Sequence, residues 1–167
     1  MHNSYIHSAI RELRDQQVRF APRERKLEQV DRAEQLLLEL EDSRVYTYEY
    51  LCYRVTTYRP EAYPDVRMRG HEVAHDLRLF VEDVSDSAHL PVEEVPEPVL
   101  TVEELSRRFQ VSTKTISRWR QQGLVSRRFV FDGRKRVGFL ESSVDRFVRD
   151  NGERVRRGAQ FSQLTVD

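Results

Sequence analysis

Two helix-start signals lie close together in the C-terminal half of this chain, and they limit what that half can form. Thr101-Val102-Glu103-Glu104 matches a capping box, in which the threonine and the second glutamate satisfy backbone groups of the first turn. Ser112 can cap a second helix, expected over Thr113–Gln122 and ended by Gly123. Because only residues 110–112 separate the two helices, the sequence predicts a helix-turn-helix.

Apolar residues occupy the positions that two crossing helices must bury. They are Leu105, Val111, Ile116, Trp119 and Leu124. If Ile116 and Trp119 face this core, the opposite side of the second helix presents polar and basic groups to solvent.

A β-hairpin is predicted directly after the second helix. Alternating residues flank Asp132-Gly133, a pair suited to a type I′ turn, over residues 127–139. A closing helix, expected over Ser142–Asp150, then presents Val144, Phe147 and Val148 to the core. The hairpin would be the wing of a winged helix-turn-helix.

The formal net charge of zero conceals two oppositely charged halves. Residues 1–100 contain 13 Lys/Arg and 20 Asp/Glu, whereas residues 101–167 contain 15 Lys/Arg and 8 Asp/Glu. Between Arg107 and Arg136, ten basic residues accompany a single acidic one, Asp132. Such a division predicts two modules, of which the basic one has an anionic partner.

These features together predict that residues 100–150 bind double-stranded DNA. A helix fits the major groove, where Arg or Lys can bind guanine and Gln can bind adenine, and a basic hairpin can contact phosphates. The predicted contacts are Thr113, Lys114, Ser117, Arg118 and Gln121 from the helix, and Arg127, Arg128, Arg134, Lys135 and Arg136 from the wing.

Leu100–Val148, with LTVEELSRRFQVSTKTISRWRQQGLVSRRF and the following DGRKRVGFLESSVDRF, resembles the MerR/excisionase class of winged helix-turn-helix domains. More narrowly, STKTISRWRQQGLVSRRFVFDGRKRVGFL and the tail RRGAQFSQLT are similar to the N-terminal extension of certain bacterial primary sigma factors. The first resemblance implies a DNA-binding transcription regulator. The second implies a sigma-factor-like role in transcription initiation, in which RNA polymerase is a partner.

The fold expected for the whole chain is mainly α. Residues 1–84 are expected to form an acidic helical domain, with helices from about Ile6 to near Pro22, Arg23 to Glu41 and His71 to Val84. Residues 85–99 contain three prolines among glutamates, which predicts an extended, solvated linker. Residues 151–167 are expected to be a basic flexible tail. The helical domain would contact RNA polymerase or a second copy of the chain.

The segment Val45–Tyr58 supports two interpretations. Tyr48, Leu51, Cys52 and Val55 have helical spacing, whereas alternate tyrosines from Tyr46 are typical of a strand, and we favour a helix. The tyrosine-rich stretch can pack in a core, form a partner surface or stack on a nucleobase.

His71-Glu72-Val73-Ala74-His75 matches the HExxH motif of zinc peptidases, in which two histidines bind zinc and the glutamate activates water. The apolar stripe of the same helix leaves His71 and His75 on a polar face with Arg78 and Glu82, and the charged Asp76 follows the second histidine. We therefore expect no metal site, no cofactor, no catalytic residue and no enzyme activity.

Three hypotheses thus remain: a DNA-binding transcription factor, a protein-interaction module of the transcription machinery, and, as a minor alternative, a zinc peptidase. The chain has no apolar run long enough for a membrane span and no export signal at Met1–Tyr5. Cys52 is the only cysteine, which excludes an intrachain disulfide and favours a reducing compartment. A cytoplasmic location is expected.

Overall fold

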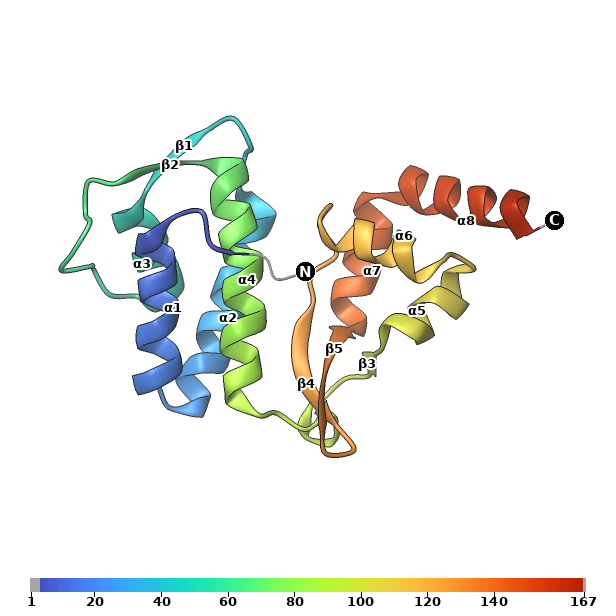
Figure 1. Ribbon diagram of the computed structural model, residues 1–167, viewed down its shortest axis with the longest axis horizontal. Helices are drawn as coiled ribbons and strands as arrows, with labels where there is room; N and C mark the ends of the chain where they lie inside the picture. Colours follow the sequence, from blue (N-terminus) through green and yellow to red (C-terminus); the bar gives the residue numbers. More distant parts are fainter. Residues whose placement is uncertain (1–3, 167) are drawn as a thin grey trace. The chain divides into compact units, whose positions relative to one another are not determined.

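The computed structural model describes residues 4–166, with side chains for residues 4–159, and divides into two compact units, 1–89 and 90–167. The described residues are mainly helical, with small antiparallel sheets (Figure 1). This confirms the predicted fold class of a helical domain followed by a small unit that contains a hairpin. None of the described helices combines the length and the apolar character that a membrane crossing requires.

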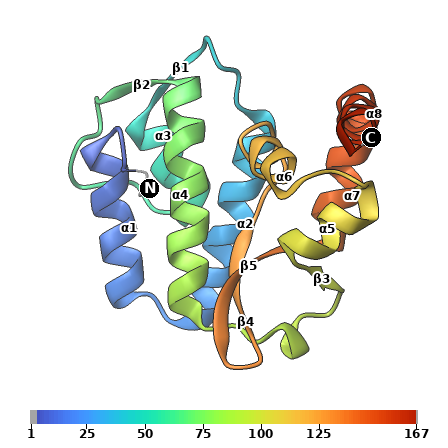
Figure 2. The same ribbon diagram turned by 45° about the vertical axis from the view of Figure 1, so that its right-hand side comes forward.

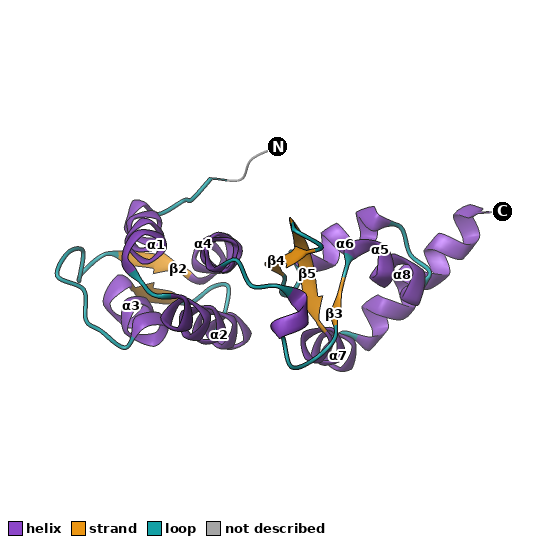
Figure 3. Cartoon of the chain, turned by 90° about the horizontal axis from the view of Figure 1, so that it is seen from below, coloured by secondary structure: helices purple, strands orange, loops and turns teal. Residues whose placement is uncertain are grey.

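The first unit is a packed group of helices with a two-stranded antiparallel sheet (Figures 1 and 3). Its core is formed by apolar residues from every helix, including Ile10, Val30, Leu51, Leu77 and Phe80, all fully buried. The elements are α1 (Ser8–Phe20), α2 (Arg23–Glu39), β1 (Val45–Thr47), α3 (Tyr48–Thr56), β2 (Arg67–Arg69) and α4 (Gly70–Ala88).

Val45–Tyr58 contains both of the structures that its sequence suggests. Val45–Thr47 forms strand β1, paired with β2, and helix α3 begins at Tyr48. The change occurs where the Thr47 hydroxyl accepts a hydrogen bond from Tyr50 N at 3.2 Å and so caps the helix. The prediction of a helix over the whole segment was therefore wrong for Val45–Thr47.

The side chain of Asp76 holds the segment before α1 in place. This carboxylate lies in the middle of α4, is fully buried, and accepts hydrogen bonds from Ile6 N at 2.8 Å and His7 N at 2.9 Å. Burial raises the pKa of the Asp76 carboxyl, while the two N–H donors act in the opposite direction. The chain before α1 is thus attached to α4 by one acidic side chain.

The second unit combines a three-stranded antiparallel sheet, in the order β3-β5-β4, with helices (Figure 2). In its core, Trp119 lies 5.8 Å from Phe109 and 5.6 Å from Phe147 between ring centroids. The elements are the 3₁₀ helix η1 (Val92–Glu94), β3 (Val99–Leu100), α5 (Val102–Phe109), α6 (Thr113–Arg120), β4 (Arg127–Phe131), β5 (Arg134–Leu140), α7 (Glu141–Asp150) and α8 (Gly152–Val166).

The predicted linker over residues 85–99 is wrong at both ends. Helix α4 continues to Ala88, and Val99–Leu100 pairs with β5. Between them, the Glu97 carboxylate accepts hydrogen bonds from Ser142 N at 2.8 Å and Ser142 Oγ at 3.1 Å, at the start of α7. Prolines lack an N–H donor but keep the carbonyl acceptor, and Pro98 O accepts from Glu141 N at 3.1 Å. The segment is therefore part of the folded unit.

The tail was also expected to be flexible, but Gly152–Val166 forms helix α8. Val155 is buried, and Gly158, three residues later, faces Trp119 and Val111. This spacing places both residues on one side of a helix. The basic residues around them conceal this apolar face in the sequence.

We expect Asp76→Asn to lower the free energy of unfolding by about 1–3 kcal/mol, because the amide can accept only one of the two N–H groups and leaves the other buried without a partner. Urea denaturation followed by circular dichroism measures this loss. Glu72→Gln is the control, since its contact with His7 is partly exposed to solvent and should contribute much less to stability. Equal losses in the two variants would contradict the role given to Asp76.

We expect Gly158→Ala to displace α8, because the added Cβ would lie 2.9 Å from Trp119 Cζ2. The expected cost is about 1–3 kcal/mol, measured by denaturation followed through the fluorescence of Trp119, the only tryptophan. The matched control is Gly152→Ala in the same helix, where the new Cβ meets nothing within 4 Å. Identical unfolding midpoints for the two variants would show that α8 does not pack on Trp119.

Candidate nucleic-acid interface

Helices α5 and α6 follow one another within the second unit, separated by the short turn that the sequence predicts. The capping box at the start of α5 is present, with Thr101 N donating to Glu104 Oε1 at 2.9 Å and Glu104 N donating to Thr101 Oγ1 at 3.1 Å. Gln110 adopts a left-handed backbone conformation that ends α5, and Val111 N then donates to Ser106 O at 3.1 Å. The turn is therefore as tight as its sequence predicts.

Helix α6 has one buried side and one exposed side. Ile116 and Trp119 are buried, and Ser112 caps the helix by accepting from Thr115 N at 3.1 Å. All five side chains predicted as DNA contacts on this helix and at its C-terminal end are exposed. They are Thr113, Lys114, Ser117, Arg118 and Gln121. The helix thus presents two cations and three polar groups to solvent.

The hairpin β4–β5 turns at Asp132-Gly133, as predicted. Both residues have positive φ, 47° and 79°, which is the backbone of a type I′ turn and which glycine adopts at little cost. The strands pair from Arg127 with Gly138 to Phe131 with Arg134. Figures 1 and 2 show that the hairpin leads away from α6, so that its turn and α6 lie at different ends of the unit.

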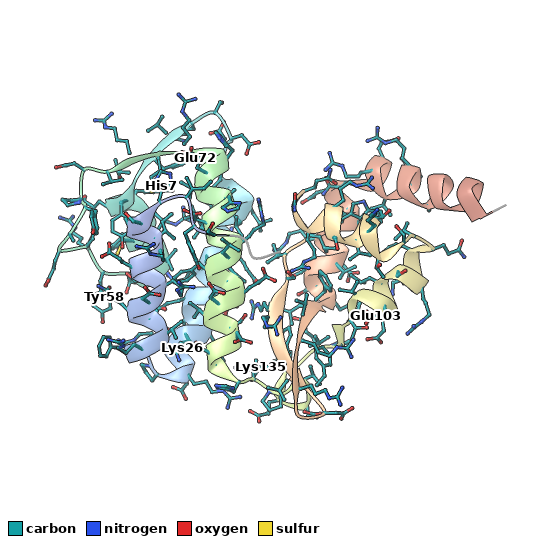
Figure 4. All side chains as sticks on the ribbon, viewed as in Figure 1. His7, Lys26, Tyr58, Glu72, Glu103 and Lys135 are labelled. Atoms are coloured by element: carbon teal, nitrogen blue, oxygen red, sulfur yellow. The ribbon has the colours of Figure 1, made fainter. Side chains whose placement is uncertain are left out.

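The wing cations differ in exposure. Arg134 and Lys135 are exposed next to the turn (Figure 4). Arg136 is also exposed, but it forms an ion pair of 2.7 Å with Glu103 Oε1 of α5. Arg128 is half-buried and donates to the carbonyl oxygen of Lys135 at 3.3 Å. The turn end of the hairpin thus carries two exposed cations, Arg134 and Lys135.

Arg127 differs from the other predicted contacts because it is buried, with 8% of its surface exposed. It begins β4 and alternates along that strand with Arg128, so that it shares a face with Phe129, which is 2% exposed. The sequence identifies Arg127 as basic but does not reveal this burial. We therefore leave it out of the accessible surface.

Sequence reasoning missed two basic residues of α8. Arg156 and Arg157 are exposed and immediately precede Gly158, which contacts α6 through Trp119 and Thr115. Their charge is visible in the sequence, but the helix that carries them was not predicted. Arg156 forms an ion pair with Glu153.

The HExxH segment of α4 has other partners in the structure. Glu72 contacts His7 Nε2 at 3.1 Å, which lowers the pKa of the Glu72 carboxyl (Figure 4). His75 Nε2 lies 2.9 Å from Ser4 O, and the exposed His71 lies near Asp42 O. In the described part of the chain, no three His, Cys, Asp or Glu side chains gather as a metal-ligand set.

Comparison of the chain with protein-family models, with curated proteins and with solved structures gives no match.

We expect Ser112→Ala to destabilise the second unit by about 0.5–2 kcal/mol, because the N–H of Thr115 loses its cap. Thermal unfolding followed by Trp119 fluorescence measures the change. Ser117→Ala, at an exposed position inside the same helix, should leave stability within about 0.5 kcal/mol of the parent. A larger loss for Ser117→Ala than for Ser112→Ala would contradict the capping role.

Proposed function

We propose that the second unit binds double-stranded DNA as a winged helix-turn-helix and that the chain acts in transcription, as a regulator or as a sigma-factor-like initiation protein. The observation that carries the proposal is the exposed side of α6. Lys114, Ser117 and Arg118 project from a helix whose other side is held in the core by Ile116 and Trp119. Helix α6 would enter the major groove, where such side chains read base edges.

The hairpin supports the same proposal through charge. Arg134 and Lys135, next to the turn, would neutralise phosphates. A strand of five residues is about 17 Å long, which is roughly half of the helical repeat of about 34 Å. The hairpin is therefore long enough to reach phosphates beside the groove that α6 would occupy.

The first unit would supply a protein contact, with RNA polymerase or with a second copy of the chain. Its sequence is acidic and thus unsuited to DNA. Activity of this kind would take place in the cytoplasm. If the basic surface of the second unit instead meets an acidic protein, DNA binding will be absent even at low salt.

The DNA-binding proposal is tested by fluorescence anisotropy of the full chain with labelled duplex DNA across a salt series, first with random sequence and then with a selected site. Arg118→Ala should weaken binding to the selected site by about 1–3 kcal/mol and change binding to random DNA much less. Arg134→Ala should weaken binding to all sequences. It should also reduce, by about 1, the slope of the logarithm of the binding constant against the logarithm of the salt concentration.

The control is Arg149→Ala, which removes one positive charge from an exposed position on α7. It should affect binding far less than Arg134→Ala, because Arg149 belongs to neither α6 nor the hairpin. Equal effects of Arg134→Ala and Arg149→Ala on binding would show that the hairpin does not contact the DNA. Absence of binding at low salt would refute the DNA proposal as a whole.

A further inference from the structure

One of the cations expected to contact phosphate already has an anionic partner within the second unit. Arg136 of β5 donates from Nη2 to Glu103 Oε1 of α5 at 2.7 Å. The two residues are 33 positions apart in the sequence, so the pairing becomes visible only in the structure. It connects the hairpin with the beginning of α5, where Glu103 is located (Figure 4).

Arg136 and Arg134 share one face of the hairpin but differ in their surroundings. They are two residues apart on β5, and side chains at this spacing point to the same side of a strand. Arg134 is exposed next to the turn and forms no ion pair within the described part of the chain. The guanidinium of Arg136 lies between Glu103 and the Phe131 ring, whose centre is 5.9 Å from the guanidinium carbon. A phosphate could reach Arg134 directly, whereas at Arg136 it would compete with a carboxylate.

The ion pair is too exposed to matter much for stability. The side chain of Arg136 is 48% exposed and that of Glu103 is 54% exposed. Ion pairs open to water contribute little to the free energy of unfolding, because water and salt screen them. The pair does, however, cancel one positive charge of the hairpin. Its consequence is therefore expected in the binding of anions rather than in folding.

Glu103 has no part in the cap of α5. Glu104, the next residue, completes the capping box with Thr101, and the carboxylate of Glu103 instead reaches Arg136. In helix-turn-helix proteins the first helix crosses the DNA backbone, and α5 would take this position under the proposed function. A carboxylate in the first turn of α5 would then lie near phosphates and repel them.

We propose that Glu103 limits the affinity of the second unit for DNA, because it pairs with Arg136 and keeps this arginine from binding a phosphate. The inference rests on the DNA binding proposed above and states how that binding is restrained. Phosphate contacts supply the part of the affinity that does not depend on sequence. A chain with one masked arginine binds all sequences more weakly, so it is held less firmly by the many competing sites of a genome.

The test is fluorescence anisotropy of the full chain with labelled random-sequence duplex DNA across a salt series. We expect Glu103→Gln to bind about three- to tenfold more tightly than the parent at about 0.1 M salt, because one more arginine neutralises a phosphate. For the same reason, the slope of the logarithm of the binding constant against the logarithm of the salt concentration should become steeper by about 1.

A second substitution shows whether the gain comes through Arg136. Arg136→Gln alone should weaken binding, because it leaves the charge of Glu103 uncompensated. The double variant Glu103→Gln/Arg136→Gln should return to the affinity of the parent, because the pair of positions is again neutral. The control is Asp145→Asn, which removes one negative charge from an exposed position on α7 and should leave the slope unchanged.

Thermal unfolding followed by Trp119 fluorescence checks that every variant folds. Weaker binding by Glu103→Gln would show that the ion pair positions the hairpin, and a double variant as tight as Glu103→Gln would show that Arg136 takes no part. Either result overturns the proposal. If the parent binds DNA and Glu103→Gln has the same affinity and slope, only this inference fails. If the parent does not bind even at low salt, the proposed function fails and this inference with it.

Discussion

The second unit depends on the burial of Trp119. Its ring contacts Phe109 of α5 and Phe147 of α7, and Gly158 of α8 comes close to the same ring. One side chain of α6 therefore connects that helix with three others. Aromatic residues bury more apolar area than most other side chains, so this contact determines how α6 is rotated about its axis. The exposure of Lys114, Ser117 and Arg118 is a consequence of that rotation.

The hairpin is determined by local chemistry at its turn and by the burial of Phe129 and Phe139. Asp132 and Gly133 provide the two positive φ angles of the turn, and the strands follow from it in register. The ion pair between Arg136 and Glu103 then ties the hairpin to the start of α5.

Features that depend on neighbouring residues could be predicted from the sequence. The caps at Thr101 and Ser112, the core positions of α5 and α6 and the turn at Gly133 are of this kind. Features that depend on distant partners could not. Asp76 meets N–H groups about 70 residues away, and Glu97 caps a helix that starts more than 40 residues later. Likewise, strand alternation places Arg127 on a face but does not reveal that this face is buried.

The start of the second unit has a consequence for its solubility. Strand β4 is at the edge of the sheet, where free N–H and C=O groups can recruit a strand from another molecule. Val130 N, near the middle of this edge, already donates to Leu90 O at 2.9 Å, and Pro91 forms a bridge beside it. Since proline has no N–H of its own, the segment that covers the edge offers no donor there to a further strand. Pro91 thus protects this edge of the hairpin from intermolecular β-sheet formation.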